Sequence, residues 1–184
     1  MRTRTKVMGK DGFVIVYTGN GKGKTTAALG MALRAAGYNH KICIIQFIKG
    51  SWPYGEMESI KRLEPEVELV IVGKGFVGII DDKSPREDHV KIAKEAIKTS
   101  REKIQSGNYN IVILDEVNYA IKLGLIDVND VLELIKSKPK KLNLVLTGNH
   151  AKPEIIDVAD LVTEMKEIKH PFKSGIKAKK GIDF

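Results

Sequence analysis

The chain has 184 residues, of which 42% are hydrophobic and 29% are charged, and its formal net charge at pH 7 is +8. This balance is typical of a globular protein and argues against a disordered chain, and the longest apolar runs are too short to cross a bilayer. A single cysteine, Cys43, excludes an internal disulfide and a cysteine-based metal cluster. No apolar stretch of signal-peptide length follows the basic amino-terminal residues, so we expect a cytoplasmic protein without a membrane partner.

Short apolar runs alternate along the chain with segments of helical periodicity. The predicted strands cover residues 13–17, 42–47, 67–72, 111–114, 142–146 and 161–165. The predicted helices cover residues 24–37, 55–63, 84–107, 128–137 and 152–160. Continuous apolar strands between helices are typical of a parallel sheet that helices cover on both faces. We therefore predict one α/β domain over residues 1–184, built on a doubly wound, mostly parallel sheet.

The longest predicted helix carries its own boundary signals. Ser84 is followed three residues later by Glu87, which is the spacing of a capping box. Gly107 suits the other end, where a helix commonly stops at a residue with positive φ. These signals predict that the helix begins at Ser84 and ends near Gly107.

The segment TGNGKGKTT, residues 18–26, lies between the first predicted strand and the first predicted helix. It matches the phosphate-binding pattern G-x-x-x-x-G-K-[ST], except that Thr18 stands where the leading glycine is expected. Threonine adopts a positive φ only at a cost, so we expect an altered loop entrance. Gly19, Gly21 and Gly23 permit close backbone approach, so successive N–H groups can surround phosphate oxygens. The strand–loop–helix context predicts a P-loop NTPase (RecA-like) fold and a polyphosphate site.

Charged and hydroxyl side chains complete the predicted site. Lys24 supplies a point charge to the phosphates, and Lys22 adds a second cation. The Thr25 hydroxyl is a candidate ligand of Mg²⁺. The sequence ILDEVNYA places Asp115 and Glu116 at the end of a buried strand, where P-loop proteins hold Mg²⁺ with a carboxylate. Acids in this position also cap the next helix, but their pairing with the loop favours the metal role.

These features leave two function classes open. The loop and the acidic pair alone allow a P-loop NTPase or a small-molecule kinase. The net charge of +8 allows a basic module that binds nucleic acid without catalysis. Aromatic residues make up only 6% of the chain and do not alternate with the basic ones, so we expect no nucleic-acid partner.

Several motifs resemble those of the P-loop type of ATP:corrinoid adenosyltransferase, the cob(I)alamin adenosyltransferases of bacterial cobalamin metabolism. The resemblance spans nearly the whole chain in order, and threonine at the head of the loop is that family's own form. The motifs are TGNGKGKTT (18–26), QFIKGSWPYGE (46–56), GKGF (73–76), ILDEVNYA (113–120), LTG (146–148), IIDVADLVTEMKEIKHPF (155–172) and GIKAKKGIDF (175–184).

The resemblance implies a particular reaction. A reduced Co(I) corrinoid attacks the 5′-carbon of ATP, and the triphosphate leaves intact. ATP is held in the reverse of the orientation usual in P-loop hydrolases, which gives the altered loop a purpose. Because Co(I) is itself the nucleophile, the protein needs no Ser, Cys or His nucleophile, and its task is positioning and charge stabilisation. The resemblance also implies Mg²⁺, an electron donor such as a reduced flavoprotein, and a homodimer.

Roles for individual residues follow from the motifs and the resemblance together. Lys24 and Glu116 are expected to be catalytic, and Thr25, Asp115 and Glu116 are expected to hold Mg²⁺. The basic C-terminal segment 166–184 is expected to pack near the nucleotide site. For Arg34 and His170, an ordinary place on the solvated surface stays open. The residues expected to bind ATP are Gly19, Asn20, Gly21, Lys22, Gly23, Lys24, Thr25, Thr26, Arg34 and His170.

Phe76 is expected to contact the corrinoid. In the family, an aromatic pair presses on the lower face of the corrinoid and helps to remove its axial ligand. Related sequences often place a threonine and a tryptophan after GF, whereas this chain has Val77 and Gly78. We expect Phe76 to act alone, or Tyr54, Trp52 or Phe172 to substitute for the missing aromatic residue. Ordinary core packing of Phe76 is the alternative.

Overall fold

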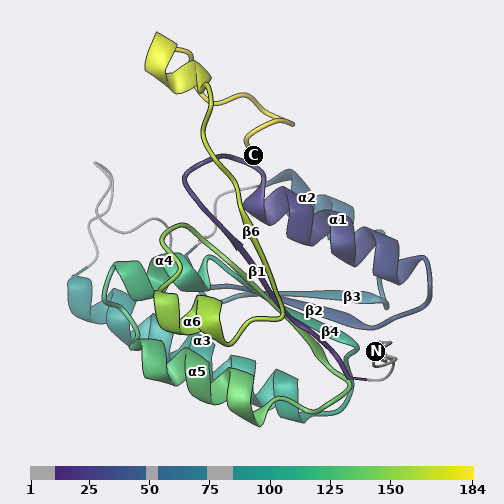
Figure 1. Ribbon diagram of the computed structural model, residues 1–184. Coiled ribbons are helices and arrows are strands. Elements are labelled where there is room, and N and C mark those ends of the chain that lie inside the picture. Colours follow the sequence, from purple (N-terminus) through teal and green to yellow (C-terminus); the bar gives the residue numbers. More distant parts are fainter. Residues whose placement is uncertain (1–10, 49–53, 74–84) are drawn as a thin grey trace, which may run out of the picture.

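A computed structural model of the chain describes residues 11–48, 54–73 and 85–184. Within these residues, six strands form one sheet in the order β3-β2-β4-β5-β1-β6 (Figure 1). Every neighbouring pair of strands in it is parallel, which confirms the predicted sheet class. The strands are β1 (Val14–Thr18), β2 (Ile42–Gln46), β3 (Val67–Ile71), β4 (Ile111–Asp115), β5 (Asn143–Thr147) and β6 (Leu161–Glu164), and each overlaps a predicted strand.

Helices cover both faces of this sheet, as a doubly wound fold requires (Figure 1). None of the helices in the described ranges is long and apolar enough to span a membrane. One face carries α1 (Lys24–Ala36) and α2 (Gly55–Lys61), and the other carries α3 (Arg86–Gln105), α4 (Val117–Lys122), α5 (Val128–Ser137) and α6 (Pro153–Asp157).

Alternate side chains of the central strands enter two separate cores. On one face, Ile44 of β2 packs with Ala28 and Ala32, whose small side chains let α1 approach the sheet closely. On the other face, Ile45 and Leu114 belong to the larger core that α3, α4, α5 and α6 cover. Fully burying one of these large aliphatic side chains contributes about 1.5–3 kcal/mol. Burial on both faces explains why these strands lack polar alternation.

Two helix predictions need correction. The predicted capping box is wrong, because α3 begins at Arg86 with Pro85 as its N-cap and without a side-chain cap, and Ser84 lies outside the described residues. Proline suits this place since it has no N–H to leave unpaired. The short helix α4 (Val117–Lys122) was not predicted at all. At the other end of α3, Gly107 has a positive φ of 73°, as predicted.

The last residues leave the sheet as an extended segment, residues 165–184, which we call the C-terminal arm. The arm continues β6 outward to the 3₁₀ helix η1 (Pro171–Ser174) and then returns toward the start of α1, where the chain ends (Figure 1). Its large apolar side chains are mostly in solvent, with Ile168 85% and Phe172 77% exposed. The arm therefore contributes little to either core.

Candidate functional site

The carboxyl ends of three neighbouring strands meet at one edge of the sheet. The phosphate loop, residues 19–23, leaves β1 after Thr18 and enters α1 at Lys24. Strand β5 lies between β1 and β4 and places the Thr147 hydroxyl 2.7 Å from Asp115, the last residue of β4. Ligand sites of parallel α/β sheets form at this edge. The fold thus brings the predicted loop and the predicted acidic pair together.

Thr18, which replaces the leading glycine of the pattern, is the final residue of β1 and is buried. Its hydroxyl accepts a hydrogen bond of 3.0 Å from the Ala151 amide, and its carbonyl accepts one of 2.8 Å from the Met165 amide. The positive φ angles of the loop occur instead at Gly19 (94°) and Gly23 (110°). Threonine at position 18 is therefore accommodated without strain, and it ties the loop entrance to the segment after β5.

The loop glycines have a second reason to be glycines, because the C-terminal arm crosses the loop at close range. The Gly21 amide donates a hydrogen bond of 2.7 Å to the Met165 carbonyl. A Cβ atom at Gly19 would lie 2.4 Å from that carbonyl oxygen, and one at Gly21 would lie 2.8 Å from the Lys166 carbonyl oxygen. Both contacts are with backbone, which cannot swing aside. Any side chain at these two positions would push the arm off the loop.

Lys24 lies folded into the phosphate loop. Its Nζ donates hydrogen bonds to the carbonyls of Gly19 (2.9 Å) and Gly21 (2.7 Å). Burial lowers the pKa of Lys24, and the nearby charge of Lys22 lowers it further. Glu116 and Asp115 act in the opposite direction, because their negative charges favour the charged form of Lys24. A cation in this partly desolvated place interacts strongly with an anion, because little water screens it.

Asp115 is only 1% exposed. Its Oδ1 accepts hydrogen bonds from the hydroxyls of Thr25 (2.8 Å) and Thr147 (2.7 Å). Its Oδ2 accepts a longer one, of 3.4 Å, from Nε2 of Gln46. A buried carboxylate needs such donors. The sequence prediction named Thr25 and Asp115 but missed Thr147 and Gln46, although each is a polar residue that ends an apolar strand.

Glu116 occupies the turn between β4 and α4 with φ 63° and ψ 19°, a left-handed conformation that is rare for a residue other than glycine. Its amide donates a hydrogen bond of 2.9 Å to the Thr147 hydroxyl. That hydroxyl therefore holds both members of the acidic pair, since it accepts from Glu116 and donates to Asp115. The arrangement turns Glu116 toward the cavity described below.

The side chains at this edge include oxygen donors of the type that Mg²⁺ binds. Mg²⁺ prefers oxygen ligands and takes one or two carboxylates together with phosphate oxygens and waters. The Thr25 hydroxyl donates a hydrogen bond to Asp115, and Thr25 and Glu116 both line the cavity described below. In the described ranges no group of three or more His, Cys, Asp or Glu residues could hold a metal ion. A metal at this edge would therefore need the hydroxyl and a phosphate-bearing ligand as well.

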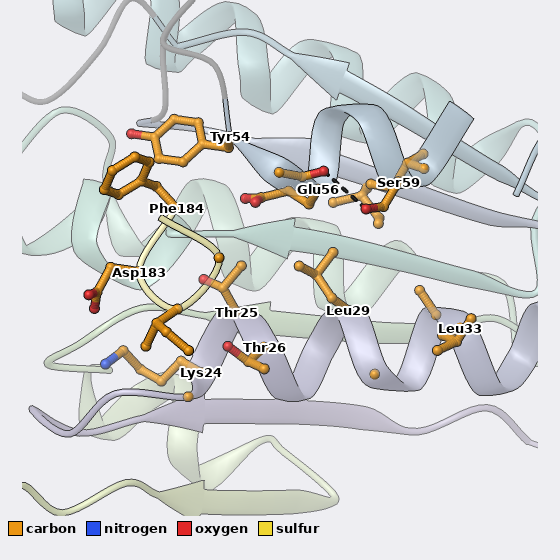
Figure 2. Close-up of a pocket in the computed structure, with 18 of the residues that line it drawn as sticks. Lys24, Thr25, Thr26, Leu29, Leu33, Tyr54, Glu56, Ser59, Asp183 and Phe184 are labelled. Atoms are coloured by element: carbon orange, nitrogen blue, oxygen red, sulfur yellow. Dashed lines mark hydrogen bonds between the residues drawn. The ribbon is translucent and has the colours of Figure 1, made fainter. Parts of the chain in front are cut away.

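A cavity of about 730 Å³ opens from the phosphate loop along α1 (Figure 2). Polar groups gather at the loop end, and aliphatic side chains line the stretch between α1 and α2. The C-terminal turn, residues 181–184, forms part of the wall. The side chains that point into this space include Lys24, Thr25, Thr26, Leu29 and Leu33 from the α1 side, Tyr54, Glu56 and Ser59 from the α2 side, and Asp183 and Phe184 from the chain end.

The C-terminal turn is attached to the phosphate loop by an ion pair between Lys22 and Asp183. The other carboxylate oxygen of Asp183 accepts a hydrogen bond of 2.7 Å from the Lys179 amide. Pairing with Lys22, then the Lys179 amide, and more weakly the charge of His170 lower the pKa of Asp183. The charged state of this carboxylate is therefore favoured next to the loop.

The remaining predicted ATP-binding residues are dispersed. Arg34 lies exposed in the last turn of α1, about 15 Å along the helix axis from Lys24, and is not among the described residues that line the cavity. His170 is the N-cap of η1, where its Nδ1 accepts a hydrogen bond of 3.2 Å from the Phe172 amide. Asn20 is exposed on the loop. Phe76, the predicted corrinoid contact, lies outside the described residues.

Solved structures with a similar fold support the P-loop class. The flagellar accessory protein FlaH from Methanocaldococcus jannaschii superposes with a TM-score of 0.56 at 14% identity, over 84% of this chain and 71% of that one. A KaiC-like protein from Pyrococcus horikoshii superposes with a TM-score of 0.52 at 14% identity, over 86% of this chain and 75% of that one. At such low identity the likeness shows the fold alone.

Sequence comparisons are more specific. The model of the family ATP:corrinoid adenosyltransferase BtuR/CobO/CobP matches residues 10–184. Proteins named corrinoid adenosyltransferase are 41% identical in a Sinorhizobium species (100% of this chain, 84% of that protein) and 39% identical in Pseudomonas aeruginosa (94% and 84%). The Escherichia coli K12 protein of that name is 36% identical, over 94% of this chain and 86% of its own length. This chain therefore belongs to the ATP:corrinoid adenosyltransferase family.

Proposed function

We propose that this protein transfers the 5′-deoxyadenosyl group of ATP to the cobalt of a reduced Co(I) corrinoid and releases triphosphate. In this step the electron pair of Co(I) forms the bond to the 5′-carbon. The bond from that carbon to the phosphate oxygen breaks, and its electron pair leaves with triphosphate. The observation that carries the proposal is a phosphate loop, backed by Asp115, in a chain that matches proteins named corrinoid adenosyltransferase over most of their length.

The phosphate loop serves this reaction by stabilising the departing triphosphate. Negative charge grows on the phosphate oxygens as the carbon–oxygen bond breaks, so a preorganised cation beside them lowers the barrier. We assign this role to Lys24, and the support is that its Nζ lies within the loop, bonded to the Gly19 and Gly21 carbonyls. The aliphatic side chain of Leu29, one turn along α1, also lines the cavity, and apolar surroundings strengthen such an interaction.

Thr25, Asp115 and Glu116 are the residues that we propose to hold Mg²⁺. When bound, the ion supplies positive charge that neutralises the phosphate oxygens of ATP and of the leaving triphosphate. Thr147 keeps Asp115 and Glu116 in place through its two hydrogen bonds. Glu116 needs this support, because its left-handed backbone costs free energy that the surrounding contacts must offset.

The remaining roles inferred from the resemblance are part of the proposal. Arg34 and His170 contact ATP, the C-terminal segment 166–184 packs near it, and Phe76 contacts the corrinoid. The protein acts in the cytoplasm as a homodimer, and a reduced flavoprotein or a similar donor supplies the electron that forms Co(I).

A Phe76→Ala variant should lose more activity when Co(II) corrinoid is reduced in the assay than when Co(I) is supplied. Equal losses under both conditions would remove Phe76 from the reduction step.

Anaerobic incubation with ATP and a Co(I) corrinoid tests the central proposal. We expect the corrinoid spectrum to change to that of the adenosylated form and one intact triphosphate to appear for each corrinoid consumed. A P-loop NTPase or a small-molecule kinase would instead convert ATP to ADP. ADP as the main nucleotide product, with an unchanged corrinoid spectrum, would overturn the proposal in favour of that alternative.

A further inference from the structure

The end of the chain lies inside the site that the phosphate loop forms. Gly181, Ile182, Asp183 and Phe184 all line the cavity together with Lys24 and Thr25 (Figure 2). Figure 2 shows the labelled Asp183 and Phe184 on a turn above the start of α1. This contact joins residues that are 161 positions apart in the sequence, Lys22 and Asp183.

The turn has its own internal structure, which aims the Asp183 carboxylate at the loop. The Gly181 amide donates a hydrogen bond of 2.7 Å to the Phe184 carbonyl, and Gly181 has a φ of 78°, which glycine adopts readily. One carboxylate oxygen of Asp183 accepts a hydrogen bond from the Lys179 amide, and the other forms an ion pair with Nζ of Lys22. The carboxylate is therefore held at both oxygens and presents its charge to the loop.

The Asp183 carboxylate binds Lys22 in the way that a phosphate oxygen binds a lysine of a phosphate loop. Both groups are anionic oxygen acceptors that a lysine ammonium binds by charge-assisted hydrogen bonds. The side chain of Lys22 is 49% exposed and that of Asp183 is 19% exposed, so water partly screens the pair. Exposed ion pairs contribute at most about 1 kcal/mol. A ligand with several negative charges can displace such a pair, whereas the pair can still compete with a ligand that is leaving.

We propose that the C-terminal turn is an internal competitor of triphosphate for Lys22. The turn withdraws when the triphosphate group of ATP occupies the loop, and Asp183 recaptures Lys22 as the product triphosphate departs. The turn thereby weakens the binding of the product and speeds its release. This inference rests on the proposed function, because only adenosyl transfer makes free triphosphate a product of the site.

The first experiment measures the affinity for inorganic triphosphate by calorimetry, using the full chain and two variants of equal net charge. Asp183→Asn keeps the size of the side chain and removes the competing charge. Glu167→Gln is the matched control, because Glu167 pairs with Lys173 on the same arm and does not line the cavity. We expect Asp183→Asn to bind triphosphate about two- to fivefold more tightly than Glu167→Gln, as loss of an exposed pair predicts. Equal or weaker binding by Asp183→Asn overturns the proposal.

The second experiment follows the turn directly. The Gly181 amide is bonded to the Phe184 carbonyl within the turn, so the rate of its hydrogen exchange, measured by NMR, reports how often the turn opens away from the cavity. We expect inorganic triphosphate to raise this rate severalfold in the unmodified chain and to change it little in Asp183→Asn, whose turn is already released. Slower exchange of the Gly181 amide with triphosphate bound would mean that the turn closes over the ligand, and it would overturn the proposal.

A third variant separates this inference from the proposed function. Lys24→Ala should lose most of its affinity for inorganic triphosphate whether or not the turn competes. Unchanged binding by Lys24→Ala would refute the phosphate site itself. Weak binding by Lys24→Ala, combined with equal binding by Asp183→Asn and Glu167→Gln, would leave the site intact and refute only the competition.

Discussion

The phosphate loop and the C-terminal arm border the same cavity, but the chain holds them by different means. The loop is continuous with β1 and α1. Behind it, Asp115 is buried and accepts hydrogen bonds from Thr25 of α1, Thr147 of β5 and Gln46 of β2. The arm has exposed side chains along most of its length. It is attached to the loop mainly through Met165 and the Lys22–Asp183 pair.

This difference in support matches the proposed roles, in which the loop takes part in the reaction and the end of the arm moves as ligands bind and leave. Groups that must be in place before ATP arrives need a rigid support, because misplacing them weakens the stabilisation of the transition state. Groups that must move during each turnover need contacts that break at little cost, and such segments come from the least stable parts of a structure. On the roles proposed above, the loop and Asp115 belong to the first kind. The end of the arm belongs to the second.

The largest expected effect comes from removing the loop cation. Lys24→Ala should lower the rate of adenosyl transfer by about 10²–10³-fold, because one preorganised group beside the leaving charge is lost. The measurement is triphosphate release under anaerobic conditions with pre-reduced corrinoid. Lys173→Ala removes an equal charge from the arm and should stay near the unmodified rate. A near-normal rate of adenosyl transfer by Lys24→Ala would contradict the view that the loop, unlike the arm, takes part in the reaction.

A second substitution tests whether the hydrogen bonds of Thr147 to Glu116 and Asp115 stabilise the structure behind the loop. Thr147→Val keeps the shape of the side chain but leaves the Glu116 amide without its acceptor and Asp115 without one donor. Buried polar groups left unpaired in this way should lower the free energy of unfolding by about 1–3 kcal/mol. Urea denaturation measures this, with Thr163→Val on the exposed strand β6 as the control. Equal midpoints for the two variants would contradict the role of Thr147.

Cys43, near the amino end of β2, reports on the larger core through the pH dependence of stability. Burial first, and then Glu68, raise the pKa of this thiol from its ordinary 9.0 to about 12, while Lys103 opposes them. The folded state thus favours the neutral thiol, so its contribution is complete below pH 9 and is lost as the pH rises above it. Between pH 8 and pH 10, the unmodified chain should lose about 1.4 kcal/mol more stability than Cys43→Ala. Parallel pH profiles from urea unfolding would show that the thiol is open to solvent.

The smallest effect is expected on the arm. Phe172 is 77% exposed on η1, so Phe172→Ala should change the free energy of unfolding by less than about 0.5 kcal/mol. Leu114→Ala in the buried strand β4 should cost about 2–5 kcal/mol by the same urea measurement. A loss for Phe172→Ala comparable to that for Leu114→Ala would show that the arm is as firmly packed as the sheet.

Sequence patterns predicted the site where the relevant signal is local. The spacing of glycine and lysine in residues 18–26 located the phosphate loop, and the run before Asp115 located the buried strand beside it. The prediction of an altered loop entrance at Thr18 treated that residue in isolation. In the fold, Thr18 is ordinary strand, and its hydroxyl binds the Ala151 amide. That partner lies 133 positions away, and no local pattern indicates it.

By itself, the sequence determined the α/β class, the place of the phosphate loop and the resemblance to the adenosyltransferases, because periodicity and short motifs depend on neighbouring residues alone. Only the tertiary structure decided that β5 stands between β1 and β4, which makes Thr147 the hydroxyl that binds Asp115. It also decided that the chain end returns to Lys22. Such contacts depend on strand order and on packing over the whole chain. The sequence contains many threonines, lysines and aspartates, and no local pattern indicates which of them meet.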